Sequence, residues 1–266
     1  MSHKVYITNN QKAVKIPSGL RILIRRASNA ALEYEKFEGN TEVSVIFVDN
    51  EEIAKLNEQY RGKPPPPAGE IARDLCAKGV KLLGTGEMGI GNTTTSSAVA
   101  AVFLDKEPVV MTGRGAGLSS EGLQRKIKAI ETGIAVNKPD PADPLDVVSK
   151  VGGLDLAGLA GVFLGGAMCR VPVLVDGFIS SVAALIAARL CPACKDYMLG
   201  SHASDEPASK LVLSELGLEP FLYAGMRLGE GTGAVAVMPL LDMGLAVYRE
   251  MTTFEAADIE AYQPLS

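Results

Sequence analysis

The sequence predicts an α/β protein in which helices cover both faces of a parallel sheet. Two observations lead to this prediction. Beyond residue 67, short apolar runs that suit buried strands alternate with longer runs that suit helices, an order typical of parallel sheets. Glycine-rich segments follow several of the apolar runs, at the strand ends where ligands bind in such sheets.

The composition is that of a globular protein. The chain has 266 residues, of which 47% are apolar, so it can bury a substantial core. Its formal net charge of -5 argues against a general nucleic-acid-binding surface. The N-terminus lacks the apolar stretch of a secretory signal, and the apolar run 156–169 is too short and glycine-rich for a membrane span. We therefore expect a cytoplasmic protein with no membrane or nucleic-acid partner.

Four consecutive prolines, residues 64–67, divide the sequence into two pieces of different composition. A proline run favours extended polyproline and cannot lie inside a helix or a central strand. We therefore predict a first unit at 1–63, a proline linker at 64–67 and a main domain at 68–266. The first piece is charged and poor in glycine, and its pattern predicts a small α+β appendage.

The elements of the first piece are predicted from spacing and from residues that begin helices. Alternation of apolar and polar residues predicts a strand, and apolar residues on one helical face predict the helix after it. Pro17 suits the first turn of an earlier helix. The predicted elements are a helix over 17–32, a strand over 42–48 and a helix over 51–60.

The main domain repeats the order of strand, glycine-rich loop and helix, which predicts a Rossmann-like sheet. We expect the loops at 84–92, 112–119 and 176–181 to lie at the carboxyl ends of strands. A helix rich in Ala and Val is expected after Gly231. The predicted strands are 80–83, 108–111 and 171–175, and the predicted helices are 69–78, 92–104, 120–136, 154–169 and 178–190.

Cysteines and histidines give little support for metal or redox chemistry. Cys191 and Cys194 have C-x-x-C spacing, but they follow a helical run and have no second pair or nearby histidine to complete a zinc site. Coincidence explains the spacing better than a zinc site or a redox dithiol. The chain has only two histidines, His3 and His202, so acid–base work would fall to carboxylates. We predict no metal and no cofactor.

Two carboxylates lie in glycine-rich segments, where packing does not require a Glu. Glu87 lies in 84-GTGEMGIGNTT-94 and Glu230 in 226-MRLGEGTGA-234. Each segment alone is weak evidence, since glycine-rich turns are common connections in α/β proteins. A Glu before a helix can also simply complement the helix dipole, and this alternative stays open for Glu230. It is weaker for Glu87, because its loop already supplies Thr and Asn for capping.

Taken together, the motifs of the main domain resemble those of the nicotinate-nucleotide–dimethylbenzimidazole phosphoribosyltransferase family, which makes the lower-ligand nucleotide of cobalamin. The resemblance covers residues 69–255, about three quarters of the chain. Its motifs occur together and in family order, so the match is specific. They are 84-GTGEMGIGNTTTSSA-98, 113-GRGAG-117, 143-DPLDVVSKVGGLDLAGLAG-161, 172-PVLVDGFISSVAAL-185, 196-DYMLGSH-202 and 226-MRLGEGTGA-234.

The resemblance implies transfer of a phosphoribosyl group from nicotinate mononucleotide to 5,6-dimethylbenzimidazole, in a homodimer that needs no cofactor. Glu230 would be the general base, and Glu87 would face the reacting ribose or ring rather than the phosphate. Amide groups of glycine loops would hold the phosphate. The implied substrate and phosphate ligands are Gly86, Met88, Gly89, Gly91, Asn92, Gly113, Arg114, Gly115, Gly117, Lys126, Asp176, Gly229 and Gly231.

Three of the implied roles have alternatives that the residues leave open. Lys126 is the candidate counter-charge for phosphate, but it also lies in the basic run 125–128, which suits a solvated helix face. Asp176 is expected to cap the helix over 178–190 or to order the wall of the pocket. Ser201 and His202 are expected only to line a loop.

The first piece has a resemblance of its own, to the zinc-dependent endoribonucleases that mature bacterial ribosomal RNA. Residues 42-EVSVIFVDNEEIAKLNEQYRGK-63 carry it, and Arg61 matches an arginine implicated in that family's function. The family's active site is a later motif of three histidines, so two histidines in the chain exclude zinc-dependent RNA cleavage. The chain thus resembles a fusion of two fragments, in which the phosphoribosyltransferase part is truncated at its N-terminus. A catalytically impaired protein that only binds phosphate or a nucleotide is the alternative function.

Overall fold

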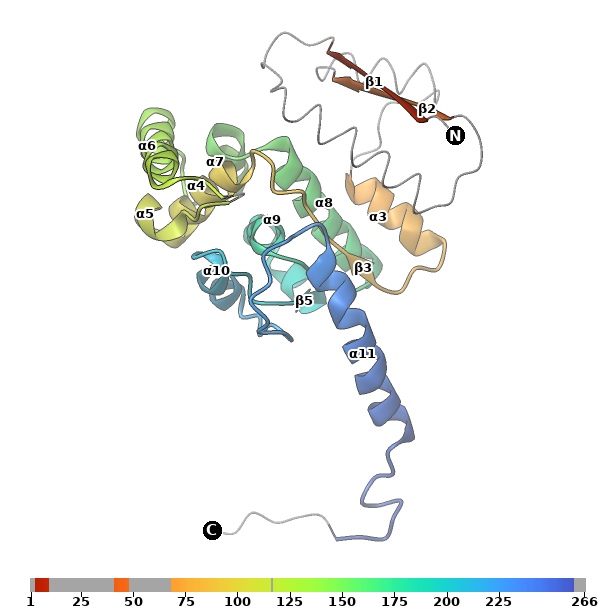
Figure 1. Ribbon diagram of the computed structural model, residues 1–266. Helices are drawn as coiled ribbons and strands as arrows, with labels where there is room; N and C mark the ends of the chain where they lie inside the picture. Colours follow the sequence, from red (N-terminus) through yellow and green to blue (C-terminus); the bar gives the residue numbers. More distant parts are fainter. Residues whose placement is uncertain (1–2, 10–40, 48–67, 116, 261–266) are drawn as a thin grey trace. The chain divides into compact units, whose positions relative to one another are not determined.

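The computed structural model describes residues 3–9, 41–47, 68–115 and 117–260. The chain divides into two compact units, Met1–Pro66 and Pro67–Ser266, and Figure 1 shows their elements. The helices predicted over 17–32 and 51–60 lie outside the described residues.

The first unit contains a pair of parallel strands. β1 (His3–Asn9) pairs with β2 (Thr41–Phe47) over seven residues each, with His3 opposite Thr41 and Asn9 opposite Phe47. The strand predicted over 42–48 is therefore confirmed, shifted by one residue. β1 was not predicted.

The second unit is built on a three-stranded sheet with the order β3-β4-β5, in which all neighbours are parallel. The strands are β3 (Leu83–Gly84), β4 (Val173–Val175) and β5 (Met198–Gly200). Because the three strands are parallel, the loops that follow them lie together at one edge of the sheet. The parallel sheet that the sequence predicts is confirmed.

Helices surround this sheet, and those predicted over 69–78, 92–104, 120–136, 154–169 and 178–190 are confirmed to within a residue or so. None of the helices in the described part of the chain is long and apolar enough to cross a membrane. The helices are α3 (Ala68–Ala77), α4 (Thr93–Leu104), α5 (Pro108–Met111), α6 (Ser120–Asn137), α7 (Pro144–Val151), α8 (Leu154–Cys169), α9 (Phe178–Leu190), α10 (Ser209–Leu216) and α11 (Thr232–Glu250).

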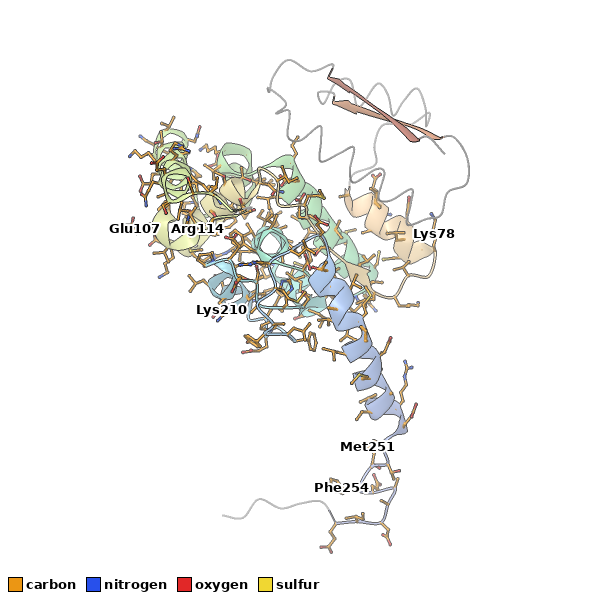
Figure 2. The ribbon with its side chains drawn as sticks, viewed as in Figure 1. Lys78, Glu107, Arg114, Lys210, Met251 and Phe254 are labelled. Atoms are coloured by element: carbon orange, nitrogen blue, oxygen red, sulfur yellow. The ribbon has the colours of Figure 1, made fainter. Side chains whose placement is uncertain are left out.

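Side chains of the central strand β4 point alternately to the two faces of the sheet. Val173 and Val175 are buried in the large core that contains α8 and α9. Leu174 packs in a second cluster with Ala234 and Val237 of α11. Because successive side chains of a strand point to opposite faces, helices cover both faces of β4. The C-terminal half of α11 extends away from the sheet, and Met251 and Phe254 lie on the segment beyond it (Figures 1 and 2).

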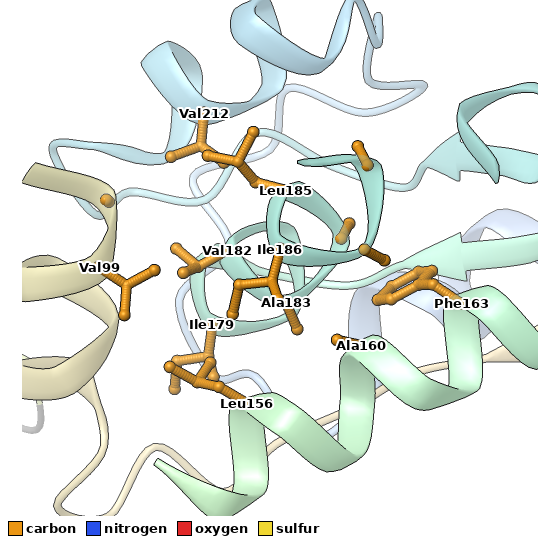
Figure 3. Close-up of a cluster of buried hydrophobic side chains, with 14 of the residues drawn as sticks. Val99, Leu156, Ala160, Phe163, Ile179, Val182, Ala183, Leu185, Ile186 and Val212 are labelled. Carbon is orange, nitrogen blue, oxygen red and sulfur yellow. The ribbon is translucent and has the colours of Figure 1, made fainter. Parts of the chain in front are cut away.

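The centre of the core is α9, in which every residue from Phe178 to Ala188 is buried. Figure 3 shows Val182 and Ile186 of this helix between Val99 of α4 and Phe163 of α8. Each such apolar side chain contributes about 1.5–3 kcal/mol by leaving water. Packing of this kind makes α9 a rigid base for the loop that precedes it.

Glycine allows α8 to pack closely on α3. A Cβ at Gly165 would lie 2.8 Å from both the Ala72 side chain and the Gly69 carbonyl oxygen. A larger residue at 165 would push the two helices apart, so the glycine-rich composition of α8 has a packing cause.

The strand predicted over 108–111 is wrong, because Pro108–Met111 forms the single helical turn α5. Pro108 suits the first helical position, and the Thr112 hydroxyl donates to the Pro108 carbonyl oxygen at 2.6 Å. Val109 and Val110 are 56% and 48% exposed, so the apolar run does not mark a buried strand. The loop at 112–119 therefore follows a helical turn and not a strand.

The other differences concern short elements. The strand predicted over 80–83 overlaps the observed strand Leu83–Gly84 only at Leu83, and the one predicted over 171–175 is shortened to Val173–Val175. α7, β5 and α10 were not predicted, nor was the short 3-10 helix η1 (Pro192–Tyr197). Elements of three to eight residues give too little periodicity to stand out from loops.

Candidate active site

A cavity lies where the three strands of the second unit end. Residues that follow β3, β4 and β5 line it, together with Gly115 and residues 227–229 ahead of α11. Its position agrees with the rule that ligands of parallel sheets bind beyond the carboxyl ends of the strands. Of the residues implied by the family resemblance, the cavity is lined by Glu87, Met88, Gly89, Gly115, Asp176 and Gly229.

The loops that carry Glu87 and Glu230 pack backbone against backbone. The Glu230 N–H donates to the Glu87 carbonyl oxygen at 2.9 Å. A Cβ at Gly86 would lie 2.5 Å from the backbone nitrogen of Gly231, and one at Gly229 would lie 2.9 Å from the Glu87 carbonyl oxygen. Glycines on both sides are therefore needed for this close approach of the two backbones.

Glu87 faces the cavity from the first of these loops. Its side chain is half-buried, and its Oε2 accepts a hydrogen bond from the Gly89 N–H at 3.1 Å. This bond fixes the carboxylate at the cavity wall and occupies one of the loop's amide donors. A second anion at the same donor would be repelled, so Glu87 suits a sugar hydroxyl or a developing positive charge better than a phosphate.

Glu230 lies at the edge of the site and does not line the cavity. It is exposed, and within the described ranges its carboxylate has no hydrogen-bonding partner. Its backbone is left-handed, with φ of +58°, between Gly229 at +77° and Gly231 at +79°. Such a φ is unusual for Glu, so the backbone itself gives no reason for a Glu at this position.

Asp176, which directly follows β4, binds the backbone at the N-terminus of α11 through its carboxylate. The buried carboxylate accepts from the Gly231 N–H at 3.1 Å, the Gly233 N–H at 2.8 Å and the Ala234 N–H at 3.2 Å. The expectation that Asp176 caps the helix over 178–190 is therefore wrong: that helix has Gly177 at its N-cap and no side-chain cap. Asp176 instead satisfies the first donors of α11, which weakens the alternative that Glu230 serves as the helix cap.

His202, which was expected only to line a loop, also lines the cavity. It is 2% exposed, and its Nδ1 lies 3.0 Å from Ser201 Oγ. Because the Ser201 hydroxyl donates to the Val175 carbonyl oxygen at 2.7 Å, its oxygen accepts from Nδ1–H. Burial lowers the pKa of His202 below its ordinary value, against the opposing charge of Asp176. The imidazole is therefore neutral at pH 7.

We expect His202 to make the fold sensitive to acid. Its folded-state pKa lies below the ordinary value of 6.5, so the unfolded chain takes up the proton first as the pH falls. The free energy of unfolding should therefore decrease from about pH 6.5 downward. Melting temperatures between pH 7.5 and 5 should fall less for His202→Gln than for the wild type. Equal losses in both proteins would show that another group causes the acid sensitivity.

Lys126 is buried beneath the loop at 113–115. Its Nζ donates to Thr93 Oγ1 at 3.0 Å and to the Gly113 carbonyl oxygen at 3.0 Å. The interpretation of Lys126 as part of a solvated helix face is therefore wrong. Burial lowers the pKa of this ammonium, and the charge of Glu206 opposes that shift.

Gly115 lies close to both Thr93 and Lys126 and has no side chain to fill the space beside them. A Cβ at this position would lie 2.9 Å from Thr93 Oγ1 and 3.6 Å from Lys126 Nζ. Thr93 and Gly115 both line the cavity. The missing side chain thus leaves room for a ligand atom to approach the ammonium.

Several predicted ligands point elsewhere. Arg114 is exposed and donates to the Leu118 carbonyl oxygen at 2.8 Å and to Ser120 Oγ at 3.2 Å, so it braces the start of α6. The Asn92 amide donates to Asp155 Oδ2 at 2.7 Å and ties α4 to α8. The residues implied by the resemblance that do not line the cavity are Gly86, Gly91, Asn92, Gly113, Arg114, Gly117, Lys126, Glu230 and Gly231.

The structure adds residues that the sequence did not indicate. Ser204 and Glu206 line the cavity from the loop after β5, and Arg227 and Leu228 line it ahead of α11. The position of Ser204 and Glu206 beyond a strand end is the signal that could have found them, but β5 itself was not predicted. Met88 and Leu228 are 60% and 66% exposed, so they offer apolar surface at the mouth of the cavity.

The described residues offer no cluster of three or more His, Cys, Asp or Glu side chains able to hold a metal ion. Cys191 is exposed, whereas Cys194 is buried, and burial raises the pKa of its thiol to about 11. A thiol with so high a pKa stays protonated at neutral pH and is a poor nucleophile.

These features define a parallel α/β protein with a strand-end site. The site combines a fixed carboxylate, a buried ammonium and apolar surface at its mouth. Residues 68–259 match the family model described as Phosphoribosyltransferase, and the chain belongs to that family. Residues 6–67 match the model described as Endoribonuclease YbeY. Both resemblances seen in the sequence are therefore confirmed.

Individual relatives agree with the family. The nicotinate-nucleotide–dimethylbenzimidazole phosphoribosyltransferase of Acetivibrio thermocellus is 58% identical over 194 residues, 73% of this chain and 55% of the relative. The protein of that name from Clostridium acetobutylicum is 53% identical over 196 residues, 74% of this chain and 56% of the relative. The chain thus spans about half the length of these curated relatives.

Solved structures share the fold. The crystal structure of CobT from Thermus thermophilus matches with a TM-score of 0.70 and 27% sequence identity, over 98% of this chain and 87% of that one. The α/β fold class predicted from the sequence is therefore confirmed.

Proposed function

We propose that the chain transfers a phosphoribosyl group from nicotinate mononucleotide to 5,6-dimethylbenzimidazole, releasing nicotinate and forming α-ribazole phosphate, a step in building the nucleotide loop of cobalamin. The observation that carries this proposal is the pairing of the Glu87 and Glu230 loops at a strand-end cavity. The chain shares 58% identity with an enzyme named for this reaction.

The phosphate of the donor is proposed to bind at the end of the cavity formed by Thr93, Gly115 and Ser204, with Lys126 beneath it. The Gly115 backbone leaves room there, and a buried ammonium is a strong partner for an anion. Of the described residues in the loops at 86–92 and 113–117, only Glu87, Met88, Gly89 and Gly115 line the cavity, so the hydroxyl groups of Thr93 and Ser204 are proposed to supply the other polar contacts.

The ribose is proposed to lie beside Glu87. As the bond between the anomeric carbon and the nicotinate nitrogen breaks, positive charge develops on the sugar, and a carboxylate fixed at the wall stabilises it. Glu87 is held by the Gly89 N–H and needs no rearrangement to do so. Nicotinate leaves with the bonding electron pair.

The acceptor base is proposed to lie at the mouth of the cavity, against Met88 and Leu228. One ring nitrogen forms the new bond to the anomeric carbon, and the proton of the other nitrogen passes to the carboxylate of Glu230. Glu230 is exposed in this structure and is proposed to reach the acceptor from the rim of the site.

We further propose that the protein is a cytoplasmic homodimer. Analytical sedimentation would measure its assembly.

The direct test is to incubate the protein with nicotinate mononucleotide and 5,6-dimethylbenzimidazole and to follow both products by chromatography. The proposal predicts α-ribazole phosphate and nicotinate in equal amounts. Nucleotide binding without either product would instead favour a protein that binds its ligand without turnover. Nicotinate and ribose phosphate without α-ribazole phosphate would show hydrolysis in place of transfer.

A further inference from the structure

Glu206 connects two segments of the cavity wall that are distant in the sequence. Its Oε1 accepts a hydrogen bond from the Gly115 N–H at 3.1 Å, across 91 residues. Its Oε2 is buried and has no hydrogen-bonding partner in the described part of the chain. Gly113 lies against the same carboxylate, and a Cβ there would collide with it. Glu206 therefore fixes the segment Gly113–Gly115 to the loop after β5.

The same segment holds Lys126. The Lys126 Nζ donates to the Gly113 carbonyl oxygen, so Glu206 and Lys126 both hold this short stretch of backbone, each through one hydrogen bond. The Glu206 charge favours the ammonium form of Lys126 against its burial. Within the described residues the two do not form an ion pair within 4.0 Å, so they act on each other across the loop.

We propose that Glu206 is a positioning residue that acts through Lys126: its carboxylate holds Gly113–Gly115 in place and supports the ammonium that binds the substrate's phosphate. This inference rests on the proposed function in one respect, the assignment of a phosphate to this end of the cavity. Glu206 itself does not bind the phosphate, because two anions repel each other.

The proposal predicts a sign change that a purely structural role does not. Removal of the Glu206 charge has two effects on a bound anion: it withdraws support from Lys126, and it removes a repulsion. With Lys126 present the first effect dominates and binding weakens. Without Lys126 only the repulsion remains, and binding stays the same or tightens.

The experiment is a double-mutant cycle of Glu206→Gln and Lys126→Met, with a titration calorimeter measuring the affinity for nicotinate mononucleotide at constant ionic strength. Gln keeps an acceptor for the Gly115 N–H and removes the charge, and its NH2 group takes the place of the unpartnered Oε2. Glu219→Gln is the matched control, because Glu219 is an exposed acid that lies just beyond α10. Melting curves confirm that each variant is folded.

Glu206→Gln should weaken binding at least threefold in the wild-type background and should not weaken it in the Lys126→Met background. Equal weakening in both backgrounds, or tighter binding in the wild-type background, would overturn the inference. A parallel titration of wild type and Glu206→Gln with inorganic phosphate separates the two proposals. If phosphate binds to the wild type and binds more weakly to Glu206→Gln, while the nucleotide binds to neither, the proposed function fails and the inference stands. If neither phosphate nor the nucleotide binds to the wild type, the inference fails.

Discussion

Replacing Glu230 by Gln is expected to lower the rate of phosphoribosyl transfer by about a hundredfold or more, because the acceptor base would lose the group that takes its proton. Gln has nearly the same shape, and the backbone bond from the Glu230 N–H to the Glu87 carbonyl oxygen does not involve the side chain. The fold and the affinity for nicotinate mononucleotide should therefore change little. Initial rates at saturating concentrations of both substrates measure the effect.

Glu121→Gln serves as the control for the Glu230 variant, since Glu121 is an exposed acid on α6 whose side chain is 90% accessible. It should leave the rate unchanged. A folded Glu230→Gln protein that turns over as fast as this control would contradict the role of general base. Glu230 would then be no more than a residue of the tight turn before α11.

Of the substitutions considered, Asp176→Ala is expected to lower the free energy of unfolding the most. Three backbone N–H groups at the start of α11 would lose their acceptor, and two of them, at Gly233 and Ala234, are buried. Each unsatisfied donor costs about 1–3 kcal/mol, and because the three share one acceptor we expect a combined loss of about 3–5 kcal/mol. For a domain of this size the melting temperature should drop by roughly 10 °C.

The matched comparison is Asp143→Ala. Asp143 caps α7 at an exposed helix N-terminus by accepting from the N–H groups of Leu145 and Asp146. Loss of an ordinary N-cap costs about 1 kcal/mol. Urea unfolding of both variants gives the two free energies, and an Asp176→Ala loss no larger than that of Asp143→Ala would show that α11 begins independently of Asp176.

Long helices are the part of the fold that the sequence predicts well. The helices α6, α8 and α9 have 13 to 18 residues each, so their length alone distinguishes them from strands. Pro108–Met111 shows the limit: four apolar residues suit a strand and a helical turn equally well, and only the surrounding packing decides between them.

The candidate site is predicted in part, for a physical reason. Glu87 and Gly89 lie within one glycine-rich motif, so local sequence indicates them. Asp176 contacts Gly233 across 57 residues, and Glu206 contacts Gly115 across 91, so these partners become visible only once the chain is folded. Arg114 and Asn92 lie in the same motifs as true lining residues, but their side chains make local or interhelical bonds instead.

The most direct test of the whole account is a crystal structure with nicotinate mononucleotide bound. We predict that the phosphate lies at the Thr93–Gly115 end of the cavity, with its oxygens about 2.7–3.2 Å from Thr93 Oγ1 or from Lys126 Nζ. The ribose should lie beside Glu87. A nucleotide bound outside this cavity, or one whose phosphate lies between Glu87 and Gly229, would contradict the assignment of the site.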